Sequence, residues 1–465
     1  MPLNRQADGA VARGLGRPVT RWHAELAWLD GRVAERALLE VDGERLSTVT
    51  EGVDPPPGAT RLAGLTLPGL ANAHSHAFHR ALRGRAQAGR GTFWSWREQM
   101  YAVAARLDPD RYHALARAVY AEMALAGITA VGEFHYLHHD PDGRSYADAN
   151  AMGAALAAAA ADAGIRLTLL DTCYLRGGFG RALEGAQRRF GDGDADRWAA
   201  RASALAAAPA IRSSPTVRVG AAIHSVRAVD TTAMQVVRDW ARERDTPLHV
   251  HLSEQPAENA DCLAATGRTP TAVLREVGVL GPATTAVHAT HLQPEDIAAL
   301  GASRSAVCLC PTTERDLADG VGPAPALAAA GSALCLGSDS HAVVDLFEEA
   351  RALELDERLV ARQRGTFAPE ALLTAATTSG MNALGWDVAL RPGALADFVT
   401  IDLCSVRTAG ATPQTAAATA VFAATAADIT SVVVGGRRIV EGAEHLALGD
   451  IGGALATAIR ALDLR

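Results

Sequence analysis

The most chemically informative stretch of the sequence is Pro68-Gly-Leu-Ala-Asn-Ala-His-Ser-His76, in which one residue separates two histidines. An apolar run from Leu65 to Leu70 leads into it. Side chains at positions i and i+2 of a strand lie on the same face, so His74 and His76 could bind one metal ion together. A motif this short also occurs by chance, and two polar histidines in an exposed strand are the alternative.

Further titratable side chains follow later strand-like runs, which makes the chance explanation less convincing. In chain order they are Glu133, His135, Tyr136, His138 and His139, then His224 and Arg227, then His249, His251 and Glu254, then His288 and His291, and finally Asp339 and His341. His249 lies one layer deeper than His251 on the same strand face, and we expect it to be a hydrogen-bonded core residue. His138, His139 and His291 could be loop residues without a role, and Glu133 could either orient a ligand or end its strand.

Three imidazoles and one carboxylate from these clusters form an N3O ligand set: His74, His76, His251 and Asp339. Such a set suits Zn²⁺ or Fe²⁺ and leaves a position for water. A metal of this kind makes water a nucleophile at neutral pH. Because the chain contains no lysine that could be carbamylated to bridge two metals, we expect one divalent ion, Zn²⁺ before Fe²⁺.

A hydrolysis also needs groups that move protons. A base must take the proton of the attacking water, and an acid must protonate the leaving nitrogen. Glu254 follows the ligand His251 by three residues and is placed to touch both water and substrate. His288 and Asp339 could hold or accept the other proton, so we predict that these three residues are catalytic.

The elements that would position these residues alternate in type. Eight strand-like runs are separated by helix-length amphipathic segments such as Asp110–Ala126, Ala147–Ala163, Thr231–Arg244 and Glu295–Leu300. The runs are Leu70–Ala77, Ile128–Tyr136, Arg166–Cys173, Val217–Ser225, Leu248–Ser253, Thr284–Ala289, Ala306–Cys310 and Ala333–Ser338. This pattern predicts an α/β fold, a (β/α)8 barrel of the TIM type over residues 67–389. Barrel active sites lie at the carboxyl ends of the strands, where the clusters stand.

Both ends of the chain show shorter β patterns. Trp22–Leu29 and Ala37–Val41 stand near the start, and Ala394–Leu403 and Ser431–Val440 near the end. Asp-Gly and Gly-Gly pairs next to these runs are typical of hairpin turns. We therefore predict that residues 1–66 and 390–465 form one small β-sandwich domain, into which the barrel is inserted.

Composition narrows the class of protein. The net charge of −8, from 52 acidic and 44 basic residues, argues against a nucleic-acid partner. No stretch approaches 18 uninterrupted apolar residues, and the first twenty residues lack the apolar core of a signal peptide, so we expect no membrane association. Six scattered cysteines fit a reducing compartment. We expect a cytoplasmic enzyme that forms a homodimer.

Four motifs in this order resemble the amidohydrolase superfamily, in its mononuclear deaminase branch. They are Leu67-Pro-Gly-Leu-Ala-Asn-Ala-His-Ser-His76, His251-Leu-Ser-Glu254, Val287-His288 and Gly337-Ser-Asp339. The resemblance covers nearly the whole chain, including the terminal β segments. It implies that His74, His76, His251 and Asp339 bind zinc and that Glu254, His288 and Asp339 move protons.

Other segments resemble the family of formimidoylglutamate deiminases: Ser75-His-Ala-Phe-His-Arg80, Phe93-Trp-Ser-Trp-Arg-Glu98, Glu133-Phe-His-Tyr-Leu-His-His-Asp140, Glu184-Gly-Ala-Gln-Arg-Arg-Phe190, Ile223-His-Ser-Val-Arg-Ala228 and Val287-His-Ala-Thr-His291. The resemblance implies hydrolysis of N-formimino-L-glutamate to N-formyl-L-glutamate and ammonia, a reaction of histidine degradation. The substrate would be a small dicarboxylate. Its contacts would be His79, Arg97, Tyr136, His224 and Arg227, and His79 stands where the family pattern has Gln.

Two other functions remain open from the sequence. A deaminase of a neutral heterocycle such as guanine, cytosine or an adenosine derivative would use the same chemistry, but it would not call for two arginines. A non-catalytic metal-binding protein would need neither Glu254 nor His288. For Arg97 and Arg227 themselves, ordinary surface salt bridges are the alternative to substrate binding.

Overall fold

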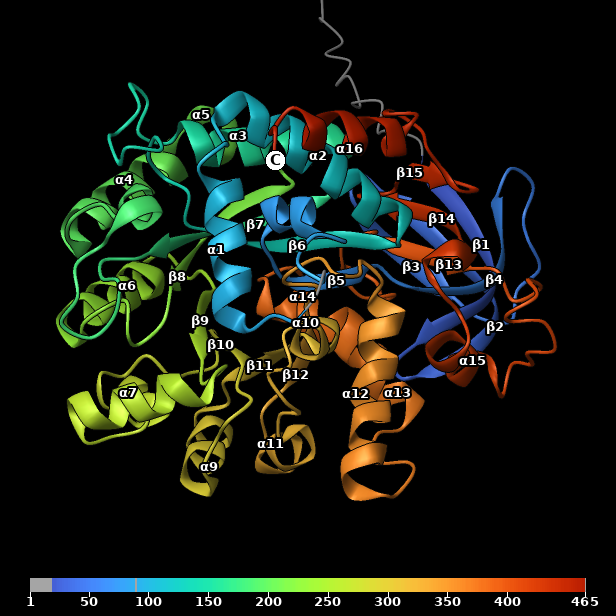
Figure 1. Cartoon of the computed structure of the whole chain (residues 1–465). Helices are drawn as coiled ribbons and strands as arrows, with labels where there is room; N and C mark the ends of the chain where they lie inside the picture. Colours follow the sequence, from blue (N-terminus) through green and yellow to red (C-terminus); the bar gives the residue numbers. More distant parts are fainter. Residues whose placement is uncertain (1–18, 88–89, 465) are drawn as a thin grey trace, which may run out of the picture.

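The computed structural model describes residues 19–87 and 90–464, which form two eight-stranded sheets and the helices around them. Figure 1 shows one sheet surrounded by helices, while the strands of both chain ends lie together at one side of the molecule. The predictions for residues 1–18, including the missing signal peptide, lie outside the described residues.

The first sheet is the predicted barrel. Its strands are β5 (Leu70–Ser75), β6 (Ile128–His135), β7 (Arg166–Cys173), β8 (Val217–Ile223), β9 (Leu248–Leu252), β10 (Thr284–His288), β11 (Ala306–Leu309) and β12 (Leu334–Leu336). They are parallel neighbours in this order. Every residue of β5, β6, β7, β9 and β10 is buried, which explains why these runs are apolar without a period of two. The prediction of a (β/α)8 fold is confirmed.

The barrel closes where the chain beyond β12 meets β5. The Asp339 backbone N–H donates to the His74 carbonyl at 3.0 Å, and Ser75 and Asp339 form a parallel bridge. The Asn72 side chain donates to Ser338 Oγ at 2.7 Å and accepts from the Ser338 N–H at 2.9 Å. β12 is shorter than the predicted run, because Gly337 and the residues after it turn against β5 instead of extending the strand.

The barrel is covered by helices that follow its strands along the chain. They are η1 (Ala77–Leu82), α1 (Phe93–Ala104), α2 (Pro109–Leu125), α3 (Ala151–Ala163), η2 (Gly185–Phe190), α4 (Ala195–Ala207), α5 (Pro209–Arg212), α6 (Thr231–Glu243), α7 (Pro256–Thr266), α8 (Pro270–Glu276), α9 (Pro294–Ser303), α10 (Pro311–Asp316), α11 (Ala324–Ala330) and α12 (Leu346–Ala361). After α12 the chain forms α13 (Pro369–Thr374), a π turn η3 (Ala375–Ser379) and α14 (Gly380–Ala383). No helix among the described residues is long and apolar enough to cross a membrane.

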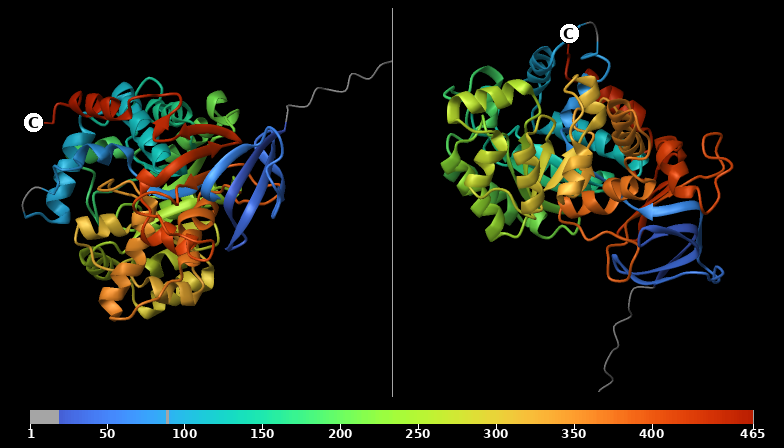
Figure 2. Two further views of the ribbon diagram at one scale, coloured as in Figure 1. Left: turned by 90° about the vertical axis from the view of Figure 1, so that its right-hand side faces the viewer. Right: turned by 90° about the horizontal axis from the view of Figure 1, so that it is seen from below.

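The second sheet unites the two chain ends, as predicted. Its order is β16-β15-β14-β13-β4-β1-β2-β3. The strands are β1 (Thr20–Leu29), β2 (Arg32–Asp42), β3 (Arg45–Thr50), β4 (Thr60–Pro68), β13 (Phe398–Ile401), β14 (Ile429–Val434), β15 (Arg437–Glu441) and β16 (Glu444–His445). β4 pairs with β13, so the two halves join edge to edge in one continuous sheet. Figure 2 shows these strands side by side.

A core of its own holds this terminal sheet together. It contains Trp22, Leu39, Leu62, Phe398 and Val433, all at most 5% exposed. The Trp22 and Phe398 rings meet edge to face with 5.4 Å between centroids. The C-terminal segment also contacts the barrel helices. α15 (Ala416–Phe422) contacts α12 and α13 and is followed by η4 (Ala426–Asp428), and α16 (Ile451–Arg460) packs on α2. The exact domain boundaries stay a prediction.

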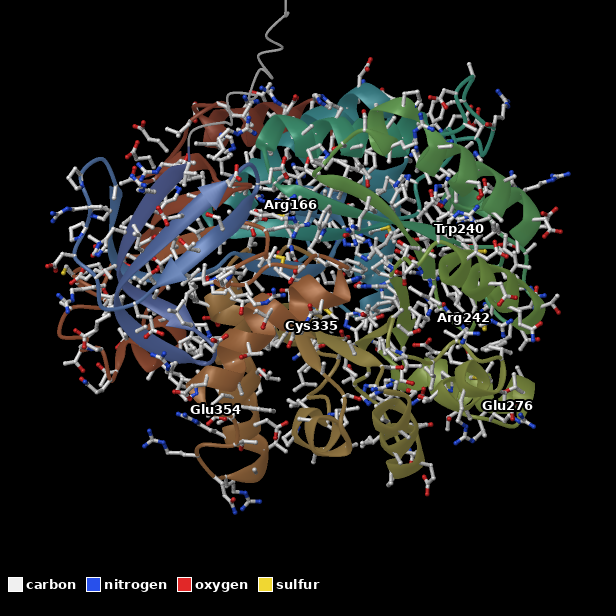
Figure 3. The ribbon with its side chains drawn as sticks, turned by 180° about the vertical axis from the view of Figure 1, so that it is seen from behind. Arg166, Trp240, Arg242, Glu276, Cys335 and Glu354 are labelled. Carbon is white, nitrogen blue, oxygen red and sulfur yellow. The ribbon has the colours of Figure 1, made fainter. Side chains whose placement is uncertain are left out.

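A buried ion pair ties the barrel to the terminal sheet. Arg166, the first residue of β7, donates from Nε to Asp397 Oδ2 at 2.6 Å and from Nη2 to Oδ1 at 2.9 Å, and both side chains are fully buried. Figure 3 shows Arg166 where the strands of the two sheets come together. Asp397 also accepts from the Gly435 N–H at 2.7 Å.

Replacing Arg166 by methionine should destabilise the protein strongly without touching the metal site. Asp397 would keep its burial but lose its cation, and breaking a buried pair costs about 3–5 kcal/mol. We expect a loss of that order in the free energy of unfolding, measured by urea denaturation. The control is Arg315→Met, since Arg315 pairs with Asp356 at an exposed site, where such pairs contribute under about 1 kcal/mol. Equal effects of the two changes would contradict the prediction.

Candidate active site

The four predicted metal ligands meet at the carboxyl end of the barrel. His74 Nε2 lies 3.3 Å and His76 Nε2 3.4 Å from Asp339 Oδ1. His251 Nε2 lies 3.1 Å from His74 Nε2. All four residues are at most 9% exposed. Side chains from β5, from His76 directly after it, from β9 and from the segment after β12 therefore present nitrogen and oxygen atoms to one buried point.

Backbone carbonyls orient two of these imidazoles. His76 Nδ1 lies 3.0 Å from the Phe134 carbonyl oxygen, and His251 Nδ1 lies 2.9 Å from the His224 carbonyl oxygen. A carbonyl can only accept, so each Nδ1 carries the hydrogen and each Nε2 presents a lone pair to the common point. Burial lowers the pKa of both rings well below the ordinary value, which keeps them neutral, as metal ligands must be.

The donor set and its spacing fit a divalent metal. Ring nitrogens with lone pairs facing each other at 3.1 Å repel unless a cation lies between them. A tetrahedral ion with bonds of about 2.0–2.1 Å holds its ligand atoms about 3.3–3.4 Å apart. The distances of 3.3 and 3.4 Å to Asp339 match that spacing. His74, His76 and His251 form one potential ligand group. Asp339 belongs to two overlapping groups, one with His74 and His288 and one with His76 and His79.

The three predicted acid–base residues border this ligand set. His288 Nε2 lies 3.9 Å from Glu254 Oε1 and 3.8 Å from Asp339 Oδ2. Burial raises the pKa of Glu254 to about 7, a value suited to exchanging protons near neutral pH. Burial alone would lower the pKa of His288, but the carboxylates of Glu254, Glu314 and Asp339 raise it to about 10. The arrangement can take up, hold and return a proton beside the ligands.

The backbone is left-handed at the carboxyl ends of three barrel strands, at or next to these residues. The φ angles are 67° at His288, 39° at Asp339 and 52° at Ser253, which precedes Glu254. Residues other than glycine rarely adopt this region, and they persist there only when their surroundings hold them. For Asp339 the hydrogen bonds to β5 provide that support. Glu133 supports the next segment, because its carboxylate accepts from the Ala77 N–H at 2.7 Å just after His76.

A pocket opens above the ligand set and contains all five predicted substrate contacts: His79, Arg97, Tyr136, His224 and Arg227. It is also lined by His76, His251, Glu254, His288 and Asp339, together with Phe93, Trp96, Met100, Tyr101, Tyr174 and Phe190. The groups predicted to hold the substrate and the groups predicted to carry out the chemistry therefore share one space.

The neutral polar contacts form a connected row in this pocket. His79 Nε2 and the Tyr136 hydroxyl lie 3.3 Å apart, and the His79 ring lies 4.5 Å from the His76 ring, centre to centre. Burial lowers the pKa of His79 to about 3, so its ring is neutral and can either donate or accept. The His224 ring lies 4.0 Å from the Tyr174 ring. His79 stands where the family pattern has Gln, and it too is a neutral side chain that can form hydrogen bonds.

The two pocket arginines do not form the surface salt bridges considered as their alternative. Arg97 lies over the rings of Trp94 and Tyr101, at 4.6 and 5.5 Å from their centres. Within residues 19–87 and 90–464, neither Arg97 nor Arg227 has an ion pair or a hydrogen bond. Burial alone would lower the pKa of Arg227, but the nearby Glu258, Tyr174 and Glu254 have the larger effect and raise the pKa above its ordinary value. The guanidinium therefore stays charged. Two guanidinium groups therefore remain available to an anionic ligand.

The other histidines make local hydrogen bonds instead of joining the ligand set. His249 is a core residue, as expected, with Nε2 3.0 Å from the Ala383 carbonyl oxygen. The others bind neighbouring groups: His138 the Thr172 carbonyl, His139 the Asp192 carboxylate, His291 the Asp319 carbonyl and His341 the Ser75 hydroxyl.

Sequence reasoning missed the aromatic wall of the pocket and one carboxylate. Phe93, Trp96, Arg97, Met100 and Tyr101 all lie on α1 and line the pocket. Their spacing of i, i+3, i+4, i+7 and i+8 is that of one helix face, so this signal was present in the sequence. Glu314, in the first turn of α10, was missed because no histidine accompanies it, although it follows the predicted run Ala306–Cys310 by four residues.

A (β/α)8 barrel with a potential metal site of His and Asp and a buried carboxylate–imidazole pair is the arrangement of metal-dependent hydrolases. The model of the Amidohydrolase family matches residues 65–439. The chain therefore belongs to the amidohydrolase family, and it is a hydrolase that acts on C–N bonds.

Curated relatives agree with this membership. The chain is 39% identical over 401 residues to formimidoylglutamate deiminase of Pseudomonas aeruginosa, which covers 83% of this chain and 87% of that protein. It is 31% identical over 410 residues to 5'-deoxyadenosine deaminase of Methanoregula boonei, with 85% of each chain covered. The resemblance to formimidoylglutamate deiminase noted in the sequence is confirmed, and other deaminases are also similar.

Solved structures share the fold over nearly the whole chain. An amidohydrolase from Brucella melitensis superposes with a TM-score of 0.88 at 34% identity, covering 95% of this chain and 99% of that one. An adenosine deaminase from Xanthomonas campestris with bound zinc gives a TM-score of 0.81 at 24% identity, covering 96% and 98%. The second likeness concerns the fold alone.

Proposed function

We propose that the protein hydrolyses N-formimino-L-glutamate to N-formyl-L-glutamate and ammonia, a reaction of histidine degradation. The observation that carries the proposal is a pair of arginines, Arg97 and Arg227, in the pocket above the ligand set, neither of which forms an ion pair within the described part of the chain. The 39% identical formimidoylglutamate deiminase supports it. A cytoplasmic location and a homodimer belong to the same proposal.

The charge of this substrate matches the pocket. N-Formimino-L-glutamate carries two carboxylates and, on nitrogen, a formimino group. A planar guanidinium can pair with a carboxylate through two parallel hydrogen bonds. We assign one carboxylate to each of Arg97 and Arg227, and a neutral hydrogen bond each to Tyr136, His79 and His224.

The metal site supplies one part of the chemistry. A divalent ion held by His74, His76, His251 and Asp339, for which we propose Zn²⁺ before Fe²⁺, provides the Lewis acidity that makes water a nucleophile at neutral pH. Glu254 takes the proton of the attacking water and passes it to the leaving nitrogen. His288 holds a proton at Nε2, between Glu254 and Asp339. Asp339 accepts the second proton of the former water and returns it to the same nitrogen, which then leaves as ammonia.

A deaminase of a neutral heterocycle is the second candidate. The aromatic wall of Trp96, Tyr101, Tyr174 and Phe190 could stack on a planar ring, and 5'-deoxyadenosine deaminase of Methanoregula boonei is 31% identical. Ammonia release from N-formimino-L-glutamate, guanine, cytosine and 5'-deoxyadenosine separates the two candidates. Preference for any of the three heterocycles would reject the proposed substrate and leave the hydrolysis of C–N bonds standing.

Removing either pocket arginine should reduce selection of the dicarboxylate. We expect Arg97→Met and Arg227→Met each to lower kcat/KM for N-formimino-L-glutamate at least about 10²-fold, because losing a desolvated charge partner costs about 2–5 kcal/mol. Metal content should not change, since neither residue belongs to the ligand groups.

The matched control for this prediction is Arg176→Met. Arg176 also follows a barrel strand, but it pairs with Asp230 at 2.8 Å and does not line the pocket. This variant should keep the wild-type kcat/KM. Normal turnover of N-formimino-L-glutamate by both pocket variants would remove the arginines from substrate binding.

A further inference from the structure

His288 has carboxylates at both of its ring nitrogens. Nε2 faces the reaction side, 3.9 Å from Glu254 and 3.8 Å from Asp339. Nδ1 faces the opposite way and lies within ion-pair distance of Glu314 Oε1, at 3.5 Å, and it has no hydrogen-bond partner among the described residues. His288 and Glu314 are 1% and 6% exposed, so water competes little for either group.

The Glu314 carboxylate is itself held in place. Glu314 belongs to the first turn of α10, and its Oε1 accepts from the Cys310 N–H at 3.0 Å. The bond satisfies the backbone N–H of the residue before the helix, as a side chain in the first turn of a helix often does, although Glu314 is the fourth helical residue and not the third residue of a capping box. Capping alone would account for a glutamate at this position. It would not account for the same oxygen facing Nδ1 of a catalytic imidazole.

We propose that Glu314 is a positioning residue that holds the hydrogen of His288 on Nδ1 and thereby keeps Nε2 directed at Glu254 and Asp339. A carboxylate can only accept, so it selects the ring form with hydrogen on Nδ1. In hydrolases with a catalytic histidine, a carboxylate behind the ring has this orienting effect and stabilises the protonated ring. The inference deepens the proposed function, because it rests on the acid–base role of His288.

Two substitutions separate orientation from capping. Glu314→Gln keeps an oxygen that can bind both the Cys310 N–H and Nδ1, whereas Glu314→Leu removes both contacts. In the zinc-loaded enzyme we expect Glu314→Leu to lower kcat about 10- to 100-fold with KM nearly unchanged, as found for outer carboxylates that orient histidines. Glu314→Gln should restore part of kcat. Zinc content should equal that of the wild type in both.

A second readout does not depend on turnover. In a ¹H–¹⁵N NMR spectrum of histidine-labelled enzyme, the His288 signals are identified by their loss in His288→Asn. The Nδ1-bound hydrogen should be visible in the wild type and shifted upfield in Glu314→Gln, because an amide accepts a weaker hydrogen bond than a carboxylate. It should be lost to exchange in Glu314→Leu. An unmoved signal in Glu314→Gln would overturn the proposal even if Glu314→Leu failed to fold.

Thr312→Val is the matched control. Thr312 lies in the same first turn of α10, and its hydroxyl donates to Glu349, away from His288. This change should lower stability without altering kcat or the His288 signals. A kcat of Glu314→Leu equal to that of Thr312→Val would also overturn the proposal. The comparison uses whichever substrate the wild type hydrolyses, so failure on N-formimino-L-glutamate would reject the proposed function and leave this test valid.

Discussion

Glu254→Gln should lose most of its hydrolytic activity while the protein keeps its metal and its fold. Glutamine preserves the shape of the side chain but cannot take a proton from water, and acid–base groups of this kind contribute about 10²–10⁴-fold to the rate. Glu254 is outside the potential ligand groups, so metal binding should be unaffected. We expect kcat to fall by that factor in steady-state assays of ammonia release.

The position of Glu254 supports so large an effect. Burial raises its pKa to about 7, so near neutral pH it can both accept and return a proton. Glu276→Gln is the control, because Glu276 lies at the end of the outer helix α8, in an exposed pair with Arg268 at the edge of the molecule (Figure 3). If a metal-replete Glu254→Gln protein turned over substrate at the wild-type rate, another group would have to be the base.

His76→Ala should remove both metal and activity and leave a folded barrel. The wild type should carry about one divalent ion per chain in the four-ligand site. Without His76, only His74, His251 and Asp339 remain of the proposed set, and affinity should fall far enough for dialysis to strip the ion. Elemental analysis measures the metal, and circular dichroism checks that the helices and strands remain.

The control for this prediction is His113→Ala on the outer helix α2. His113 lies 3.2 Å from Asp162 at a partly exposed site and has no part in the ligand groups. Its replacement should leave the metal content at the wild-type value. Two ions per chain in the wild type would refute a mononuclear centre, and an active metal-free His76→Ala protein would refute the metal-dependent mechanism.

The two predictions distinguish separate roles within one site. Loss of His76 acts on the metal, and chemistry disappears as a consequence. Loss of Glu254 acts on proton transfer, and the metal remains. Equal metal loss in both variants would mean that Glu254 belongs to the ligand set, in conflict with its absence from the ligand groups found here.

Much of the fold could be predicted from the sequence, because its signals are local. Strands that are buried on both faces must be largely apolar along their length, so they can be recognised as continuous apolar runs. The predicted runs Ile128–Tyr136 and Arg166–Cys173 match β6 and β7 within one residue. Polar residues at the ends of such runs must face the active end of a barrel. His74, His76, His251 and Asp339 could therefore be assigned to one site before their contacts were seen.

Other features depended on contacts between residues far apart in the chain, which no local pattern records. The sequence alone could not decide whether Arg97 and Arg227 are paired, because salt-bridge partners come from any element that packs nearby. Nor could it show that Glu314 faces His288, since α10 and β10 meet only through the folding of the barrel. The edge-to-edge pairing of β4 with β13 is of the same kind. Residue types and spacing determined the chemistry that this protein can perform, and packing determined which charges remain free to meet a substrate.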